Sequence, residues 1–174
     1  PKTQTWKSGF SGSGAALQKR DGTLVSSFVN RQADNSQHFY FFMSKDGGQN
    51  WYVSGNSGTA GADEPKTLER NNGDLAISVR ASGYNYHNVT SDDGETWQYP
   101  SQTRFTSGIS GNACDGEYMV WCSTLEGNPW DVAFQTLPHS GSRENVSIAL
   151  STDEGETFGT PKTICPRGSA YSAT

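Results

Sequence analysis

One eight-residue pattern occurs three times in this 174-residue chain and constrains its fold more than any other feature. The pattern reads Ser/Thr-x-Asp-x-Gly-x-x-Trp/Phe, and its copies occupy residues 44–51, 90–97 and 151–158. The Asp carboxylate can accept N–H bonds from a turn, and the glycine supplies a backbone conformation with positive φ. We therefore predict three equivalent hairpin turns, each held by a structural carboxylate: Asp46, Asp92 and Asp153. The aromatic residues that follow are expected to bury their rings: Trp51, Trp97 and Phe158.

Each copy is preceded by an Asp-Gly or Asn-Gly pair between apolar runs, which is a strong hairpin signal. These pairs stand at residues 21–22, 72–73 and 115–116. Strand-like segments surround them: Thr23–Asn30, His38–Met43, Leu75–Arg80, Tyr84–Val89, Tyr118–Ser123 and Val146–Leu150. No segment keeps a helical period over three turns. Four antiparallel strands in every 45–60 residues, roughly, are typical of a propeller blade, so we predict an all-β fold with about three blades of a β-propeller.

Composition excludes some partners. The net charge is -5, and no basic patch of the kind that neutralises phosphates is present, so we expect no nucleic-acid partner. No apolar stretch reaches the length of a membrane span. The three cysteines show no Cys-x-x-Cys spacing, and we predict neither a metal site nor a cofactor.

Two residue pairs between and beyond the repeats carry a resemblance. Glu64 precedes Pro65 and stands 16 residues before Arg80, which ends the strand after an Asn-Gly turn. Arg143 precedes the third repeat, and Tyr171 follows it in a Gly-Ser-Ala-Tyr-Ser setting. Together with the glycine-rich residues 9–14 before Asp-Gly-Thr-Leu-Val, these features resemble the bacterial sialidases of glycoside hydrolase family 33. The resemblance covers nearly the whole chain and implies the six-bladed propeller of that family, with the repeats as its Asp boxes.

The resemblance also implies roles for these residues. Arg80 and Arg143 match two of the three arginines that bind the carboxylate of sialic acid, and planar bidentate pairing suits them to it. Arg167 competes with Arg143 for this assignment. Tyr171 matches the nucleophile and Glu64 its base. A neutral phenol is not repelled by the substrate carboxylate, and sialidases are the glycosidases with a Tyr nucleophile. Ionising a free phenol at neutral pH costs roughly 4 kcal/mol, and a nearby carboxylate that accepts the proton lowers this barrier.

The function implied is that of a retaining exo-α-sialidase acting on sialylated glycans, with a secreted, periplasmic or cell-surface location. A trans-sialidase is a subclass of this function that the same residues fit. The alternative is a non-catalytic Asp-box propeller that binds glycans or proteins, because Asp boxes alone fit both. The family's first arginine and its catalytic Asp do not appear in the sequence. We therefore expect residues 1–174 to be the middle part of one propeller domain that needs its remaining blades to close.

Other aromatic residues and one histidine are predicted to lie at the rim of the sugar site or to serve in packing. Tyr84, Tyr86 and His87 are candidates for the rim of the sugar site, on its glycerol or aglycone side. Trp121 and Trp130 are predicted to serve in packing rather than as platforms for sugar rings.

Overall fold

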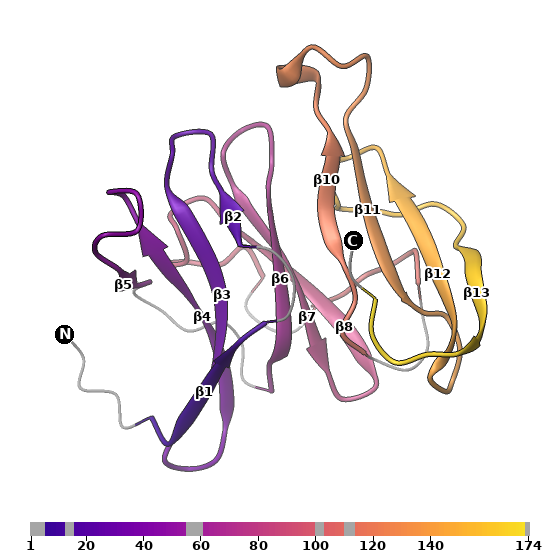
Figure 1. The fold of residues 1–174 in the computed structure, drawn as a ribbon, viewed down its shortest axis with the longest axis horizontal. Coiled ribbons are helices and arrows are strands. Elements are labelled where there is room, and N and C mark those ends of the chain that lie inside the picture. Colours follow the sequence, from indigo (N-terminus) through magenta and orange to yellow (C-terminus); the bar gives the residue numbers. More distant parts are fainter. Residues whose placement is uncertain (1–5, 13–15, 55–60, 100–102, 110–113, 173–174) are drawn as a thin grey trace.

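The protein consists of three antiparallel sheets that lie side by side (Figure 1). The computed structural model describes residues 6–12, 16–54, 61–99, 103–109 and 114–172. The first sheet contains β1 (Ser8–Ser11), β2 (Leu17–Gln18), β3 (Leu24–Arg31), β4 (Gln37–Ser44) and β5 (Tyr52–Val53). The second contains β6 (Asp63–Glu69), β7 (Leu75–Ala81), β8 (Tyr84–Thr90) and β9 (Thr103–Arg104). The third contains β10 (Tyr118–Cys122), β11 (Val132–Pro138), β12 (Glu144–Ser151) and β13 (Lys162–Gly168).

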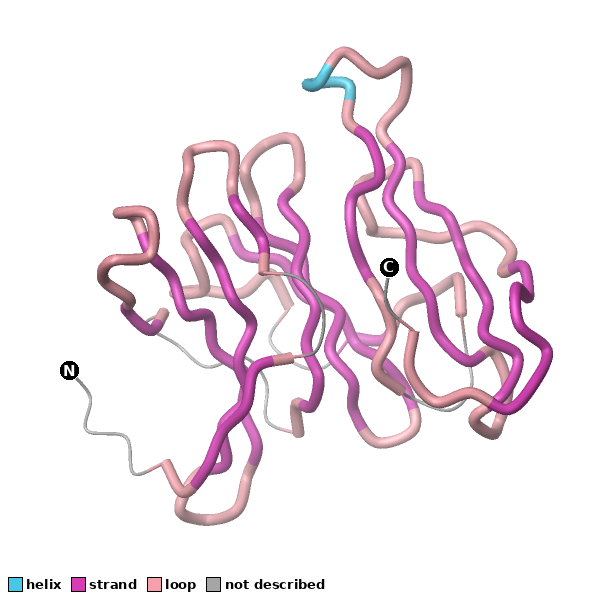
Figure 2. The backbone as a smooth tube through the Cα atoms, in the orientation of Figure 1, coloured by secondary structure: helices cyan, strands magenta, loops and turns pink. Residues whose placement is uncertain are grey.

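The predicted blades are therefore present, one per sheet, with strands in meander order. All six strands predicted from sequence are observed, and their ends differ by no more than two residues. Three seven-residue strands are absent from the six predicted segments: β6, β11 and β13. The only helical element among the described residues is a 3₁₀ turn, Thr124–Glu126, at the tip of the long β10–β11 connection (Figure 2). The described residues contain no helix with the length and apolar character needed to cross a membrane.

One predicted hairpin is wrong. Gly22 and Gly73 do form tight turns with positive φ, at β2–β3 and β6–β7. Asp115-Gly116 instead leads straight into β10, and the turn comes later, at residues 123–131. A Cβ on Gly116 would lie 1.7 Å from the backbone oxygen of Thr136 on β11. The glycine is therefore required for close approach of two backbones rather than for a turn.

Two hydrophobic cores lie between the sheets. The first joins alternate residues of β4, including Phe39 and Phe41, to alternate residues of β7, including Ile77 and Val79. The second joins the opposite face of β7, through Ala76, to the third sheet. Odd-numbered residues of β7 thus face the first sheet and even-numbered ones face the third. This alternation decides on which side Arg80 can act.

The three Asp boxes form turns of equivalent geometry, as predicted. In each, the first Ser or Thr hydroxyl donates to the Asp carboxylate at 2.8, 2.8 and 2.7 Å and accepts the glycine N–H at 2.9, 2.9 and 2.8 Å. The backbone N–H of the seventh residue donates to the same carboxylate at 2.9, 2.8 and 2.9 Å. The bond from the Asn50 N–H is the largest cause that lowers the pKa of Asp46 to about 2. The carboxylates of all three Asp boxes are therefore engaged in hydrogen bonds within their own turns.

The expected burial of the box aromatics holds for one residue only. Phe158 is 6% exposed, and Trp97 is half-buried with its ring 5.0 Å from that of Phe39 in the first sheet. Trp51 is 47% exposed, so that prediction is wrong. Trp97 and Phe158 pack toward the sheet that precedes their own, whereas among the described residues no sheet precedes the first one, to which Trp51 belongs.

Candidate active site

The four residues singled out from sequence lie at the end of the sheets opposite the Asp boxes. The boxes follow β4, β8 and β12, and these strands run toward the upper end of the molecule in Figure 1. Glu64 is near the start of β6, and Arg80 is near the end of the antiparallel strand β7. Arg143 precedes β12, and Tyr171 follows β13. Strand direction therefore places all four at the lower end.

Glu64 reaches Arg80 through a β-bulge. Asp63 pairs with Arg80 and Pro65 with Val79, so Glu64 is the extra residue of the pairing, with φ of 31°. A bulge turns a side chain away from its regular direction, and a non-glycine residue at positive φ stores strain. The Arg80 Nη1 donates to Glu64 Oε2 at 2.5 Å, and the two side chains are 22% and 15% exposed. The distortion thus serves to form a partly buried ion pair.

Tyr171 follows the outermost strand of the third sheet but lies beside the segment that precedes the innermost strand. β13 is the outermost strand of the third sheet, yet residues 170–172 lie against the segment that leads into the innermost strand, β10. The Cys114 thiol donates to the Ala170 carbonyl, and the Ser172 N–H donates to the Asp115 carbonyl at 3.3 Å. The Ser172 and Thr136 hydroxyls are 2.8 Å apart. Hydrogen bonds on both sides therefore hold Tyr171 at the inner edge of the sheet.

Arg143 lies over the ring of Tyr171, with its Cζ 5.5 Å from the ring centroid. The Ser169 N–H donates to the Arg143 carbonyl at 2.8 Å, which joins the two segments. Tyr171 is 54% exposed, and Arg143 is exposed as well. Arg167, the competing arginine, lies on the exposed edge strand β13. Of these two arginines, Arg143 is the one that contacts the Tyr171 ring.

The two pairs lie near each other, because groups of both interact with Arg80 and with Cys114. Burial lowers the pKa of Arg80, but the hydrogen bond and charge of Glu64 outweigh it, and Tyr171 adds to the net increase. Burial raises the pKa of the Cys114 thiol, the positive charges of Arg143 and Arg80 oppose this, and Glu64 supports it. Cys114 thus lies within range of groups from both pairs. The result is a small cationic site beside an exposed phenol and a carboxylate.

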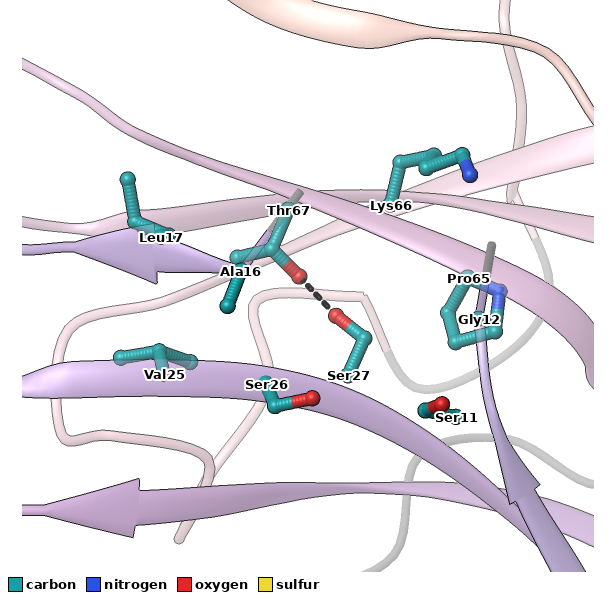
Figure 3. Close-up of a pocket in the computed structure, with 10 residues that line it drawn as sticks. All are labelled: Ser11, Gly12, Ala16, Leu17, Val25, Ser26, Ser27, Pro65, Lys66 and Thr67. Carbon is teal, nitrogen blue, oxygen red and sulfur yellow. Dashed lines mark hydrogen bonds between the residues drawn. The ribbon is translucent and has the colours of Figure 1, made fainter. Parts of the chain in front are cut away.

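A separate cavity of about 110 Å³ lies on the other side of β6, between it and the first sheet (Figure 3). Pro65 and Thr67 line it, and the Thr67 hydroxyl is 2.5 Å from that of Ser27. Gly12 approaches so closely that a Cβ there would lie 2.5 Å from the Pro65 oxygen. The cavity is therefore not part of the Glu64–Arg80 cluster, because Pro65 and Thr67 face away from the third sheet.

Comparison with known proteins places the chain in a family. The model of the BNR repeat-like domain matches residues 3–174. The chain belongs to the BNR repeat-like family.

Its relatives are sialidases. The chain is 25% identical over 174 residues to the sialidase of Micromonospora viridifaciens, covering 96% of the chain and 27% of that protein. The Hadza microbial sialidase Hz136 superposes with a TM-score of 0.77 at 24% identity over 88% of the chain and 30% of that protein. Trypanosoma rangeli sialidase in complex with the inhibitor DANA gives 0.79 at 21% identity over 97% of the chain and 28% of that protein. The fold is therefore that of the sialidase β-propeller, and the chain spans under a third of the length of these proteins.

In this BNR repeat-like chain, the rim hypothesis is wrong for two residues. His87 and Tyr86 are 4% and 0% exposed in the middle of β8. His87 stacks on Phe105 and lies 3.4 Å from Glu156 of the third Asp box, at the contact between the second and third sheets. Tyr84, at the start of β8, packs against the first core. Strand alternation turned these side chains toward neighbouring blades, which local sequence does not reveal.

The packing prediction is wrong for Trp130 and holds in part for Trp121, whose ring lies 6.1 Å from that of Phe134. Trp121, on β10, is 71% exposed, and Trp130, on the long β10–β11 connection, is 69% exposed. That connection projects from the Asp-box end, away from the candidate site (Figure 1).

Sequence reasoning missed Lys66, Asp115 and Cys114. Lys66 lies two residues after Glu64 on β6, and its Nζ is 3.0 Å from Asp115 Oδ1. The available signal was an apolar-facing strand position occupied by a lysine, which needs a buried partner. Among the described residues, no three His, Cys, Asp or Glu side chains are arranged to share a metal ion.

Proposed function

We propose that this chain carries part of the active site of an exo-α-sialidase that releases terminal sialic acids from glycans. The observation that supports this best is the meeting of the Glu64–Arg80 pair with the Arg143–Tyr171 pair at one end of the sheets. A module that only packs or binds proteins has no need of a phenol flanked by two arginines and a carboxylate. Relatives that bind sialic acid and its analogues support the same substrate class.

Each residue has a role that follows from its chemistry. Arg80 and Arg143 bind the sialic acid carboxylate, and an arginine has five N–H donors, so pairing with Glu64 does not exhaust Arg80. The Tyr171 oxygen attacks the anomeric carbon while Glu64 accepts the phenol proton. The bond from that carbon to the leaving oxygen breaks as the new carbon–oxygen bond forms. Water then attacks the same carbon and gives a proton to the group that protonated the leaving oxygen. The bond from the carbon to the Tyr171 oxygen breaks, Glu64 returns the proton to Tyr171, and the sugar leaves with retained configuration.

The leaving oxygen needs a proton donor, and the third arginine of the triad is also absent from this sequence. The proposal therefore assigns both to other parts of the same catalytic domain, which also closes the propeller. The second candidate function, a non-catalytic glycan-binding propeller, predicts sialoside binding without turnover.

The test uses the complete protein that contains this chain. A Trypanosoma rangeli sialidase has been solved with 2,3-difluorosialic acid as a covalent intermediate, which makes that compound a suitable probe. We expect release of phenol from an aryl sialoside and a covalent adduct on Tyr171 that mass spectrometry of peptides locates. Tyr171→Phe should lower kcat by roughly 10³-fold or more and remove the adduct. Tyr52→Phe is the matched control, because Tyr52 is 40% exposed beside the first Asp box, at the opposite end. Sialoside binding with neither turnover nor adduct would favour the binding module.

A further inference from the structure

A buried ion pair joins the second and third sheets next to the candidate site. Lys66 on β6 lies 3.0 Å from Asp115 in the segment before β10, and the side chains are 6% and 2% exposed. Taking two charges out of water costs several kcal/mol per ion, so such a pair is weak evidence for stability. An apolar pair would fill this contact at lower cost. A role other than stability is therefore worth seeking.

The neighbours of the pair are the candidate catalytic residues. On β6, Lys66 is next but one to Glu64. On the other side, the Asp115 carbonyl accepts the Ser172 N–H, and the adjacent Cys114 thiol donates to the Ala170 carbonyl. The two hydrogen bonds that flank Tyr171 thus join it to the short segment whose Asp115 pairs with Lys66. The charge of Glu64 contributes to raising the pKa of Asp115, after the larger effect of burial, which places the pair close to that carboxylate.

We propose that Lys66 and Asp115 are positioning residues, which set the distance between the Tyr171 nucleophile and the Glu64 base by fixing β10 against β6. The inference rests on the proposed function. It matters because Glu64 and Tyr171 belong to different sheets, so their separation is decided by how those sheets pack. A displacement of about 1 Å can cost a reaction about 10²-fold.

The chain contains a matched ion pair for comparison. Lys19 Nζ lies 2.8 Å from Asp93 Oδ1 and joins the first sheet to the second Asp box. It is also a lysine–aspartate pair between neighbouring sheets, with side chains 11% and 31% exposed, but it lies at the opposite end from Tyr171. Loss of this pair should affect stability alone.

The experiment compares double substitutions in the complete protein. Lys66→Met with Asp115→Val removes both charges, so neither partner is left buried alone. We expect an unfolding midpoint close to that of the parent, a kcat for the aryl sialoside lowered roughly 10- to 100-fold, and KM within about twofold. The rate of Tyr171 labelling by 2,3-difluorosialic acid should fall by the same factor. Lys19→Met with Asp93→Asn should leave kcat and labelling unchanged and lower the midpoint.

A single substitution covers the case in which the double variant does not fold. Lys66→Gln keeps a hydrogen-bond donor for Asp115, and in the folded protein kcat should still fall while KM does not. Parental kcat and labelling in either folded variant would overturn the positioning role. A parent that shows neither turnover nor labelling would instead overturn the proposed function itself.

Discussion

The guanidinium of Arg143 covers the ring of Tyr171 at 5.5 Å, although one residue precedes β12 and the other follows β13. The contact exists because the chain turns back after Gly168 and the Ser169 N–H bonds to the Arg143 carbonyl. A cation held on the face of a half-exposed phenol leaves its hydroxyl edge accessible. This geometry suits a residue that binds an anionic substrate beside a nucleophile.

Replacing Arg143 should weaken substrate binding specifically. In Arg143→Lys, the planar bidentate fork is lost, and KM for an aryl sialoside should rise roughly 10-fold, about 1.4 kcal/mol of binding. Arg167→Lys is the control, because Arg167 lies on the exposed edge strand β13. Steady-state kinetics of both variants decide the matter. An equal rise in KM for Arg167→Lys would return that residue to candidacy.

Asp92→Asn should destabilise the second Asp box without affecting catalysis. The Asp92 carboxylate accepts bonds from the Thr90 hydroxyl and from the N–H and hydroxyl of Thr96. Loss of these charge-assisted bonds should cost roughly 1–2 kcal/mol in chemical denaturation, with kcat within about twofold of the parent. The Thr96 side chain is the largest cause that lowers the pKa of Asp92, so this stability is present above its ordinary value of 3.8 and lost as pH falls below it. A folded variant without turnover would show that Asp92 is not merely structural.

His87 should make stability depend on pH. Burial lowers the pKa of His87 below 6.5, although the charge and hydrogen bond of Glu156 oppose the shift. Below pH 6.5, His87 therefore binds a proton more readily in the unfolded chain than in the folded protein. The free energy of unfolding should thus fall as pH drops below 6.5, by at most about 1.4 kcal/mol per pH unit. His87→Gln should flatten this slope in denaturation curves between pH 5 and about 7. An unchanged slope would assign it to other groups.

Gly116→Ala should be strongly destabilising. The added Cβ would meet the Thr136 oxygen at 1.7 Å and a Leu137 methyl at 2.6 Å, so β10 and β11 must move apart at a cost of about 3 kcal/mol or more. Because Gly116 follows Asp115, kcat should fall as well. Gly141→Ala is the control, since a Cβ there meets nothing within 4 Å. Comparable midpoints for the two variants would contradict the close approach.

Local chemistry was readable from the sequence. The Asp boxes are closed by hydrogen bonds within eight residues, so Asp46, Asp92 and Asp153 could be assigned without a structure. Glu64 and Arg80 lie on two strands of one hairpin, so the turn between them brings them to the same end, and the bulge at Glu64 completes the contact. Arg143 and Tyr171 were predicted through resemblance, and the structure brings them into contact.

Only the tertiary structure shows which face of each sheet packs against a neighbouring sheet. Neighbouring sheets or strands, which no local pattern identifies, decide three features: the exposure of Trp51, the burial of His87 and the close approach at Gly116. The Lys66–Asp115 pair is the clearest case, because its members belong to different sheets. A repeated sequence determines the shape of each blade through short-range hydrogen bonds and strand alternation. The contacts between blades, and with them the separation of Glu64 from Tyr171, arise only when the blades pack.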